Sequence, residues 1–136
     1  MPLSLSLLAA ALALGAADYA PVEDERLLAD AGRALFAIAP LRLQAIPSCR
    51  GVGLSPGDRT VGDFLGTTLT RLGNKTFAAP PLRVSAQPGG SRGRPVEVSF
   101  AYAQPDDEEE WRWGVRFTLT AAGKVVPGSV ACVVAG

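Results

Sequence analysis

The sequence predicts a small α+β domain: two N-terminal helices packed on one face of an antiparallel β-meander of four or five strands, with one disulfide. Three observations support this fold class. Apolar residues recur at helical spacing within residues 22–72, they alternate with polar residues within 82–134, and Cys49 and Cys132 are the only cysteines. A chain of 136 residues that is 48% apolar and 19% charged has the length of one domain and can bury a core.

The first residues have the pattern of a secretory signal. Residues 3–14 are almost all Leu, Ala and Ser, a run too short to cross roughly 30 Å of hydrocarbon as a helix. Small residues precede a cut after Ala17, whereas proline follows directly after a cut at Ala20. No Lys or Arg precedes the apolar run, and a buried N-terminal helix is the alternative. We expect a signal peptide over 1–17, a single domain over 18–136, and a periplasmic or secreted protein.

The two cysteines are expected to form a structural disulfide. In a short exported domain an even cysteine count is typical of a bridge, and this one would close a loop of about 83 residues, worth roughly 4–5 kcal/mol. Two thiolates cannot complete a metal site, and the chain has no histidine to add a ligand or to activate a catalytic thiol. Two free buried thiols or a redox pair are the alternatives.

Residues 22–39 are predicted to form an amphipathic helix. Acidic residues at 23–25 lie in its first turn, where the helix dipole favours them, and Pro40 ends it. The expected buried face consists of Leu27, Leu28, Ala31, Leu35 and Ile38. A short extended stretch over 41–47 should then lead to Cys49.

A second helix should end at Gly73-Asn74, and its start has two candidates. One is a serine cap followed by proline within 55–58; the other is Thr60 with Asp63. The expected buried face is Val61, Phe64, Leu65, Thr68 and Leu72. Two interior glycines each cost about 1 kcal/mol relative to alanine, so this helix is stable only when it packs on the rest of the protein.

From residue 82 the apolar period changes to two, which predicts strands. The alternating segments are 82–86, 96–103, 111–119 and 130–134, separated by turns rich in glycine. Alternation gives a sheet one apolar face, on which helices can pack, and one solvated face.

The two central strands also have a predicted register. One alignment brings together the pairs Tyr102–Trp111, Phe100–Trp113, Val98–Val115 and Glu97–Arg116. Aromatic and opposite-charge cross-strand pairs each contribute roughly 0.2–1 kcal/mol, so this alignment favours a hairpin.

An acidic run follows the first of these two strands. It consists of Asp106, Asp107, Glu108, Glu109 and Glu110. Successive carboxylates repel one another and are usually solvated, so a soluble hairpin tip is one interpretation and a surface for a basic partner is the other. The run lacks the interleaved oxygen ligands and the glycine of a calcium loop.

The loop 87–95 at the opposite end of the sheet holds Arg92 and Arg94 among three glycines. Its spacing matches neither a phosphate loop nor a dinucleotide fingerprint. A mobile linker and a contact site for an anion or a protein partner are both compatible with this composition.

Trp111 and Trp113 alternate with polar residues, which favours packing in the core. The alternative is a cradle for a small apolar ligand beside Tyr102.

Catalysis is difficult to build from these residues. Without histidine no Ser-His-Asp or Cys-His arrangement exists, and only Lys75 and Lys124 are lysines. Carboxylate pairs such as Asp58 with Asp63, or Glu97 with an acid of the acidic run, occur by chance in any chain with 13 acids. We expect no catalytic residue, cofactor or metal. Equal numbers of basic and acidic residues, 13 of each, argue against nucleic acid as a partner.

The order of helix, helix and meander is loosely similar to small outer-membrane assembly lipoproteins and to β-lactamase-inhibitor-like modules. The similarity rests on Gly53-Leu54-Ser55 ahead of a helix that contains Val61 and Gly66. The spacing from Gly53 to Val61 departs from that pattern and the cysteine of a lipid anchor is missing, so it implies no functional residues here.

These observations favour an exported, non-catalytic binding or structural module that contacts another protein of the cell envelope. A small apolar ligand-binding protein and a small carboxylate-dependent hydrolase are the alternatives. No membrane-spanning segment is expected after signal cleavage, and the sequence does not indicate an oligomeric state.

Overall fold

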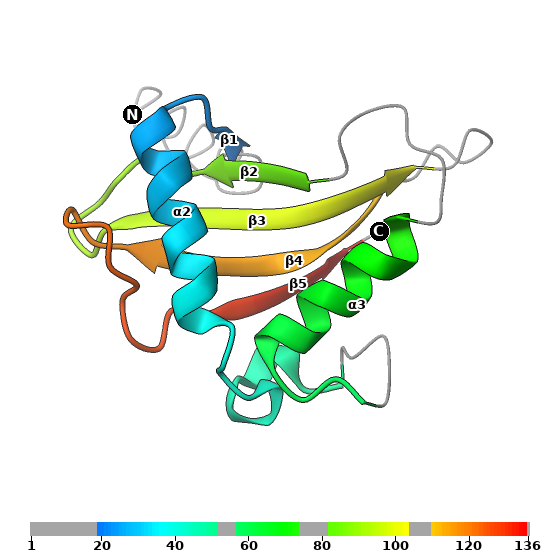
Figure 1. Ribbon diagram of the computed structural model, residues 1–136. Helices are drawn as coiled ribbons and strands as arrows, with labels where there is room; N and C mark the ends of the chain where they lie inside the picture. Colours follow the sequence, from blue (N-terminus) through cyan, green and yellow to red (C-terminus); the bar gives the residue numbers. More distant parts are fainter. Residues whose placement is uncertain (1–18, 52–56, 74–81, 104–109, 136) are drawn as a thin grey trace, which may run out of the picture.

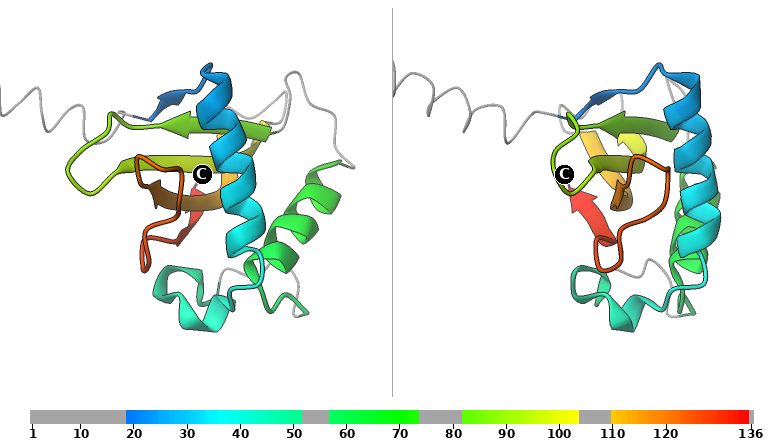
Figure 2. Two further views of the ribbon diagram at one scale, coloured as in Figure 1. Left: turned by 60° about the vertical axis from the view of Figure 1, so that its left-hand side comes forward. Right: turned by 90° about the vertical axis from the view of Figure 1, so that its left-hand side faces the viewer.

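In the computed structural model the chain forms a five-stranded antiparallel sheet with two α-helices against it (Figure 1). The structure describes residues 19–51, 57–73, 82–103 and 110–135; for 68–73, 101–103, 110–111 and 135 it describes the backbone alone. Figure 2 shows both helices on the same side of the sheet. The strands lie in the order in which they occur along the chain.

The bounds of the elements are as follows. In chain order they are β1 (Ala20–Pro21), α2 (Glu25–Ile38), the 3₁₀ turns η1 (Leu43–Ala45) and η2 (Pro47–Cys49), α3 (Val61–Gly73), β2 (Leu82–Ala86), β3 (Arg94–Ala103), β4 (Glu110–Leu119) and β5 (Ala131–Ala135). The prediction of an α+β fold with two helices, an antiparallel sheet and one disulfide is therefore confirmed. The expectation that both helices precede the sheet is wrong for one strand, because β1 precedes α2.

Sequence patterns did not indicate β1. Ala20 pairs with Ala86 and Pro21 with Ser85, so β1 extends the sheet beside β2. A strand of two residues has no alternation to detect, and a proline is tolerated there because it lies at a sheet edge.

The register of β3 and β4 is the predicted one. Its pairs include Tyr102–Trp111, Phe100–Trp113, Val98–Val115 and Glu97–Arg116. This register directs Val98 and Val115 to the helix side, where their exposed fractions are 1% and 0%.

The opposite face of the sheet differs from the expectation of a solvated surface. Glu97 and Ser99 each expose only 1%, although no helix of the described residues covers this face. The long side chains of Arg112 and Arg116 reach from β4 to the Glu97 carboxylate and shield it. The alternating pattern therefore predicts correctly on which face of the sheet a side chain lies. It does not predict how far that side chain is buried, because burial depends on neighbouring side chains.

Helix α2 begins after Asp24, whose side chain accepts a hydrogen bond from the Arg26 backbone N–H. Its buried stripe consists of Leu27, Ala31, Ala34 and Ile38. Leu28, expected on the buried face, is 38% exposed because this stripe is narrow and Leu28 lies at its edge.

Helix α3 begins by the second of the two candidate starts. The Thr60 hydroxyl accepts from the Asp63 backbone N–H at 3.1 Å, and the Asp63 carboxylate accepts from the Thr60 N–H at 3.2 Å and the Arg59 N–H at 3.0 Å. This reciprocal cap satisfies backbone donors that a helix leaves unpaired. Val61 and Phe64 are fully buried, and residues 68–73 lie outside the part whose side chains are described. Neither described helix has the length and apolar character needed to cross a bilayer.

The stretch between the helices folds into η1 and η2 instead of the extended segment expected over 41–47. Leu43 in η1 and Ile46 between the two turns are buried, so this stretch supplies apolar side chains to the core.

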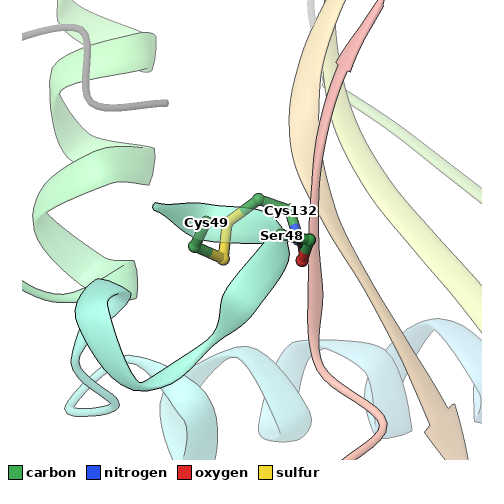
Figure 3. Close-up of a disulfide and its surroundings, with 3 residues drawn as sticks. All are labelled: Ser48, Cys49 and Cys132. Carbon is green, nitrogen blue, oxygen red and sulfur yellow. Dashed lines mark hydrogen bonds between the residues drawn. A yellow bond between two sulfur atoms is a disulfide. The ribbon is translucent and has the colours of Figure 1, made fainter. Parts of the chain in front are cut away.

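The turn η2 carries the disulfide (Figure 3). Cys49 and Cys132 are bonded, as predicted, with 5.0 Å between their Cα atoms. Beside the bridge the Cys132 backbone N–H donates to the Ser48 hydroxyl at 3.0 Å. This hydrogen bond pairs a backbone donor on the outer edge of β5, the last strand of the sheet. Covalent and hydrogen-bonding contacts thus join the helical half to the last strand.

Replacing both cysteines with alanine should lower the free energy of unfolding by up to about 4 kcal/mol, because the unfolded chain regains the entropy of an open loop of 83 residues. Urea denaturation measures this loss, and the reduced wild-type protein should unfold at the same midpoint as the double variant. An unchanged midpoint in both would contradict a stabilising bridge.

Asp63 makes the helix start sensitive to acid. Hydrogen bonds from the backbone N–H groups of Arg59 and Thr60 hold the pKa of Asp63 below its usual value of 3.8. Because the folded pKa is the lower one, the stabilisation is complete above the unfolded value and is lost as the pH falls through the folded value. The stability difference between wild type and Asp63→Ala, measured by urea denaturation, should therefore shrink in acid. Thr60→Val leaves the Asp63 carboxylate in place and removes only one of the hydrogen bonds that lower its pKa, so its stability difference should depend less on pH than that of Asp63→Ala.

Candidate functional site

A groove lies at the end of the sheet where the loops β2–β3 and β4–β5 meet the start of α2. Its volume is about 440 Å³. The lining residues come from these three segments: Asp24, Arg26, Leu27 and Asp30 from the start of α2, residues 89–94 from the β2–β3 loop, and Leu119, Thr120 and Ala121 from the end of β4. The groove therefore includes both arginines that the sequence singled out.

The β2–β3 loop is a tight hairpin tip. The backbone N–H of Gly90 donates to the Gly93 carbonyl at 2.9 Å, and the Gly93 N–H donates back to Gly90 at 3.1 Å. Ser91 and Arg92 are left as the two residues of the turn. Arg92 therefore lies at the tip of a hydrogen-bonded turn.

Gly93 lets this loop lie close to the end of β4. Its φ is +123°, in the region that favours glycine, and a Cβ there would meet the Leu119 carbonyl oxygen at 2.3 Å. The loop is thus held against β4 by a contact that no larger residue allows.

The acidic side chains of the groove have polar partners nearby, whereas its arginines have no acidic partner among the described residues. Asp24 caps α2 and Asp30 forms an ion pair with Arg33, so both carboxylates have local partners. Arg94 donates through Nε to the Gln87 carbonyl at 3.1 Å. Among the described residues no acidic side chain pairs with Arg26, Arg92 or Arg94. The groove therefore offers guanidinium groups to an anion from outside.

The floor of the groove is apolar. Leu27 is 8% exposed and Leu119 2% exposed, and the glycines of the loop add backbone surface. A site of this kind combines charge-assisted hydrogen bonds at its rim with apolar contact at its base.

The other predicted site residues lie apart from the groove. Trp113 is partly buried against the core, across from Phe100 on β3 and Val134 on β5. Tyr102 and Trp111 pair at the far end of the same hairpin, but their side chains lie outside the described part.

The acidic run falls almost entirely outside the described residues. Asp106, Asp107, Glu108 and Glu109 belong to that stretch, and Glu110 is the first residue of β4, opposite Ala103. The prediction that this run binds a partner stays a prediction.

The carboxylates considered for hydrolysis have other local contacts. Asp63 caps α3, Asp58 accepts a hydrogen bond from the Thr67 hydroxyl at 2.6 Å, and Glu97 holds two arginines. Within the described ranges no three metal-ligating side chains gather into a site.

The sequence indicated Arg92 and Arg94 but not the helix residues beside them. Arg26 lies on the polar side of the amphipathic helix, and helical periodicity gives no reason to place it near a loop about 65 residues further along. The meander does place the loops β2–β3 and β4–β5 at one end of the sheet, and this signal could have identified half of the groove.

Comparison with known proteins does not assign the chain to a family. No protein-family model matches the chain, and neither a curated protein nor a solved structure shows significant similarity to it. The loose similarity to envelope lipoproteins and inhibitor modules thus has no support beyond the residues that prompted it.

Gly93→Ala should destabilise the protein by about 1–3 kcal/mol, since it combines an unfavourable φ with the backbone clash at Leu119. Gly89→Ala in the same loop is the matched control, because a Cβ there meets nothing within 4 Å. Thermal unfolding of both variants measures the difference. Equal melting temperatures would show that the close approach of loop and strand is not required.

Proposed function

We propose that this protein is an exported, disulfide-bonded module without catalytic activity, and that its groove binds an acidic segment of a partner protein in the cell envelope. The observation that carries this proposal is the convergence of Arg26, Arg92 and Arg94 on one groove in which Asp24 caps α2 and Asp30 pairs with Arg33. The apolar floor favours a peptide that alternates acidic and apolar side chains over a small inorganic anion.

Export is supported by the disulfide, since such bridges persist in oxidising compartments and are rare in the cytosol. Strand β1 supports a signal that ends at Ala17. A cut after Ala20 would remove half of β1 and also Tyr19, whose ring lies 4.7 Å from the Arg116 guanidinium carbon. A cut after Ala17 keeps the whole of β1 and the contact between Tyr19 and Arg116.

The alternative functions have less support. Trp113 packs against the core and does not line the groove, so no contact favours an apolar ligand there. The carboxylates with described contacts cap a helix, bind a hydroxyl or hold arginines, and none of these arrangements favours hydrolysis. The acidic run remains a second candidate surface, for a basic partner.

The proposal predicts that a fluorescein-labelled peptide of alternating Glu and Leu binds the mature protein, measured by fluorescence anisotropy. The double variant Arg92→Gln/Arg94→Gln should weaken binding by about tenfold or more, because each charge-assisted hydrogen bond contributes about 1.5–3 kcal/mol. Added salt should weaken binding of the wild type, since the groove is open to solvent.

Arg42→Gln/Arg59→Gln is the charge-matched control, because both of these arginines are exposed and neither lines the groove. Its affinity should equal that of the wild type. An equal loss of peptide affinity in the two double variants would show that only the overall charge of the protein matters, which contradicts a specific groove. Absence of peptide binding by the wild type would refute the proposal. Replacing the acidic run with Gly and Ser tests the second surface and should leave this peptide's affinity unreduced.

A further inference from the structure

The face of the sheet that faces away from the helices contains a buried carboxylate between two arginines. Glu97 on β3 is 1% exposed, and its neighbours Arg112 and Arg116 on β4 keep 35% and 41% of their side chains exposed. All three residues lie on the face of the sheet opposite to the groove residue Leu119. None of them is used by the function proposed above.

One carboxylate holds both guanidinium groups in place. Arg116 donates through Nε to Glu97 Oε1 at 2.9 Å, and Arg112 donates through Nη1 to Oε2 at 3.3 Å. Ser99 lies within 3.5 Å of the same Oε2 through its hydroxyl. Because the two guanidiniums share a single carboxylate, they are held near each other on the same face despite their like charge.

Two neighbouring residues define the surroundings of the arginines. The Tyr19 ring lies against the Arg116 guanidinium, with 4.7 Å between the guanidinium carbon and the ring centroid. Gly114 lies between the two arginines on β4, and a Cβ there would meet the Val98 carbonyl oxygen at 2.1 Å. The position between the arginines therefore carries no side chain.

The cluster has an unbalanced charge. Two cations share one anion, and among the described residues no second acidic side chain pairs with either arginine. Each guanidinium uses one N–H on Glu97 and keeps its other donors for another acceptor.

Stability alone does not account for such a cluster. Burying a carboxylate costs free energy, and well-packed apolar residues of similar volume are often as stabilising as a buried ion pair. What the carboxylate does supply is position, because it fixes two planar donors in one orientation before any ligand arrives. Fixed guanidinium pairs recognise oxyanions with several acceptor oxygens on one centre.

We propose that Arg112 and Arg116, positioned by Glu97, form a binding site for a phosphate group. The phosphate oxygens accept hydrogen bonds from the donors that Glu97 leaves unused, and they balance the excess positive charge of the cluster. Glu97 is a positioning residue in this site, and Tyr19 supports one arginine. The site is independent of the groove, so either proposal can fail without the other.

The test titrates the mature, disulfide-bonded protein with inorganic phosphate at constant ionic strength. Isothermal calorimetry measures affinity, and the side-chain Nε–Hε NMR signals of the arginines show where phosphate binds. We expect saturable binding with shifts at Arg112 and Arg116. Arg112→Gln should weaken it by about tenfold, since one charge-assisted donor group is lost.

Two companion variants keep the test decisive. Arg112→Lys retains the charge but loses the planar donor group, so it should also bind more weakly than the wild type. Arg59→Gln removes an exposed arginine outside the cluster and should bind phosphate as the wild type does. A circular dichroism melt of each variant identifies any loss of fold, and phosphate binding by a folded Arg112→Gln at wild-type affinity would overturn the proposal. So would equal weakening in Arg59→Gln, or no binding to the wild type at about 10 mM phosphate.

The source of the phosphate group is decided by a second set of measurements. Sedimentation with vesicles of phosphatidylglycerol, compared with phosphatidylcholine, tests a lipid headgroup, and glycerol 3-phosphate in solution tests a free phosphate ester. Vesicle binding that depends on Arg112 identifies a headgroup, whereas ester binding without vesicle binding identifies a soluble ligand. Either result supports the phosphate site and identifies its ligand, whereas vesicle or ester binding that is unchanged in Arg112→Gln would contradict it.

Discussion

The bond between Cys49 and Cys132 is the constraint on which the arrangement of the two halves depends. It joins the turn η2, which follows the first helix, to β5, the last strand of the sheet. Because the strands lie in chain order, a tether to the last strand draws the helical half across the whole apolar face. The core then forms as one layer between the helices and the sheet, from residues of α2, α3, both turns and four strands.

Two regions outside this core differ in their chemistry. At one end, the start of α2 and two hairpin loops enclose a groove whose arginines have no acidic partner among the described residues. On the far face, Glu97 prepositions a pair of arginines. We propose a segment of a partner protein for the groove, because it adds apolar contact, and one compact anion for the arginine pair, because its donors are fixed.

The secondary elements were largely predictable because local chemistry specifies them. Alternation together with the Glu97–Arg116 charge pair identified the β3–β4 register, since a slip by one residue would turn every apolar side chain to the wrong face. The cysteine pairing followed from an even count without histidine. The start of α3 stayed open between two capping patterns, and the structure shows Thr60 with Asp63, because these two residues satisfy each other's backbone donors.

The amino-acid sequence alone determined the fold class, the strand register, the disulfide and two residues of the groove, because each depends on neighbours in the chain or on a unique partner. Only the tertiary structure decided that Arg26 joins Arg92 at the groove and that Glu97 is buried on the face expected to be solvated. Strand β1 belongs to this second group. Such features depend on which segments, distant in the sequence, come into contact in the folded chain. The burial of Glu97 also depends on arginine side chains that reach across from the neighbouring strand, and sequence periodicity does not encode such contacts.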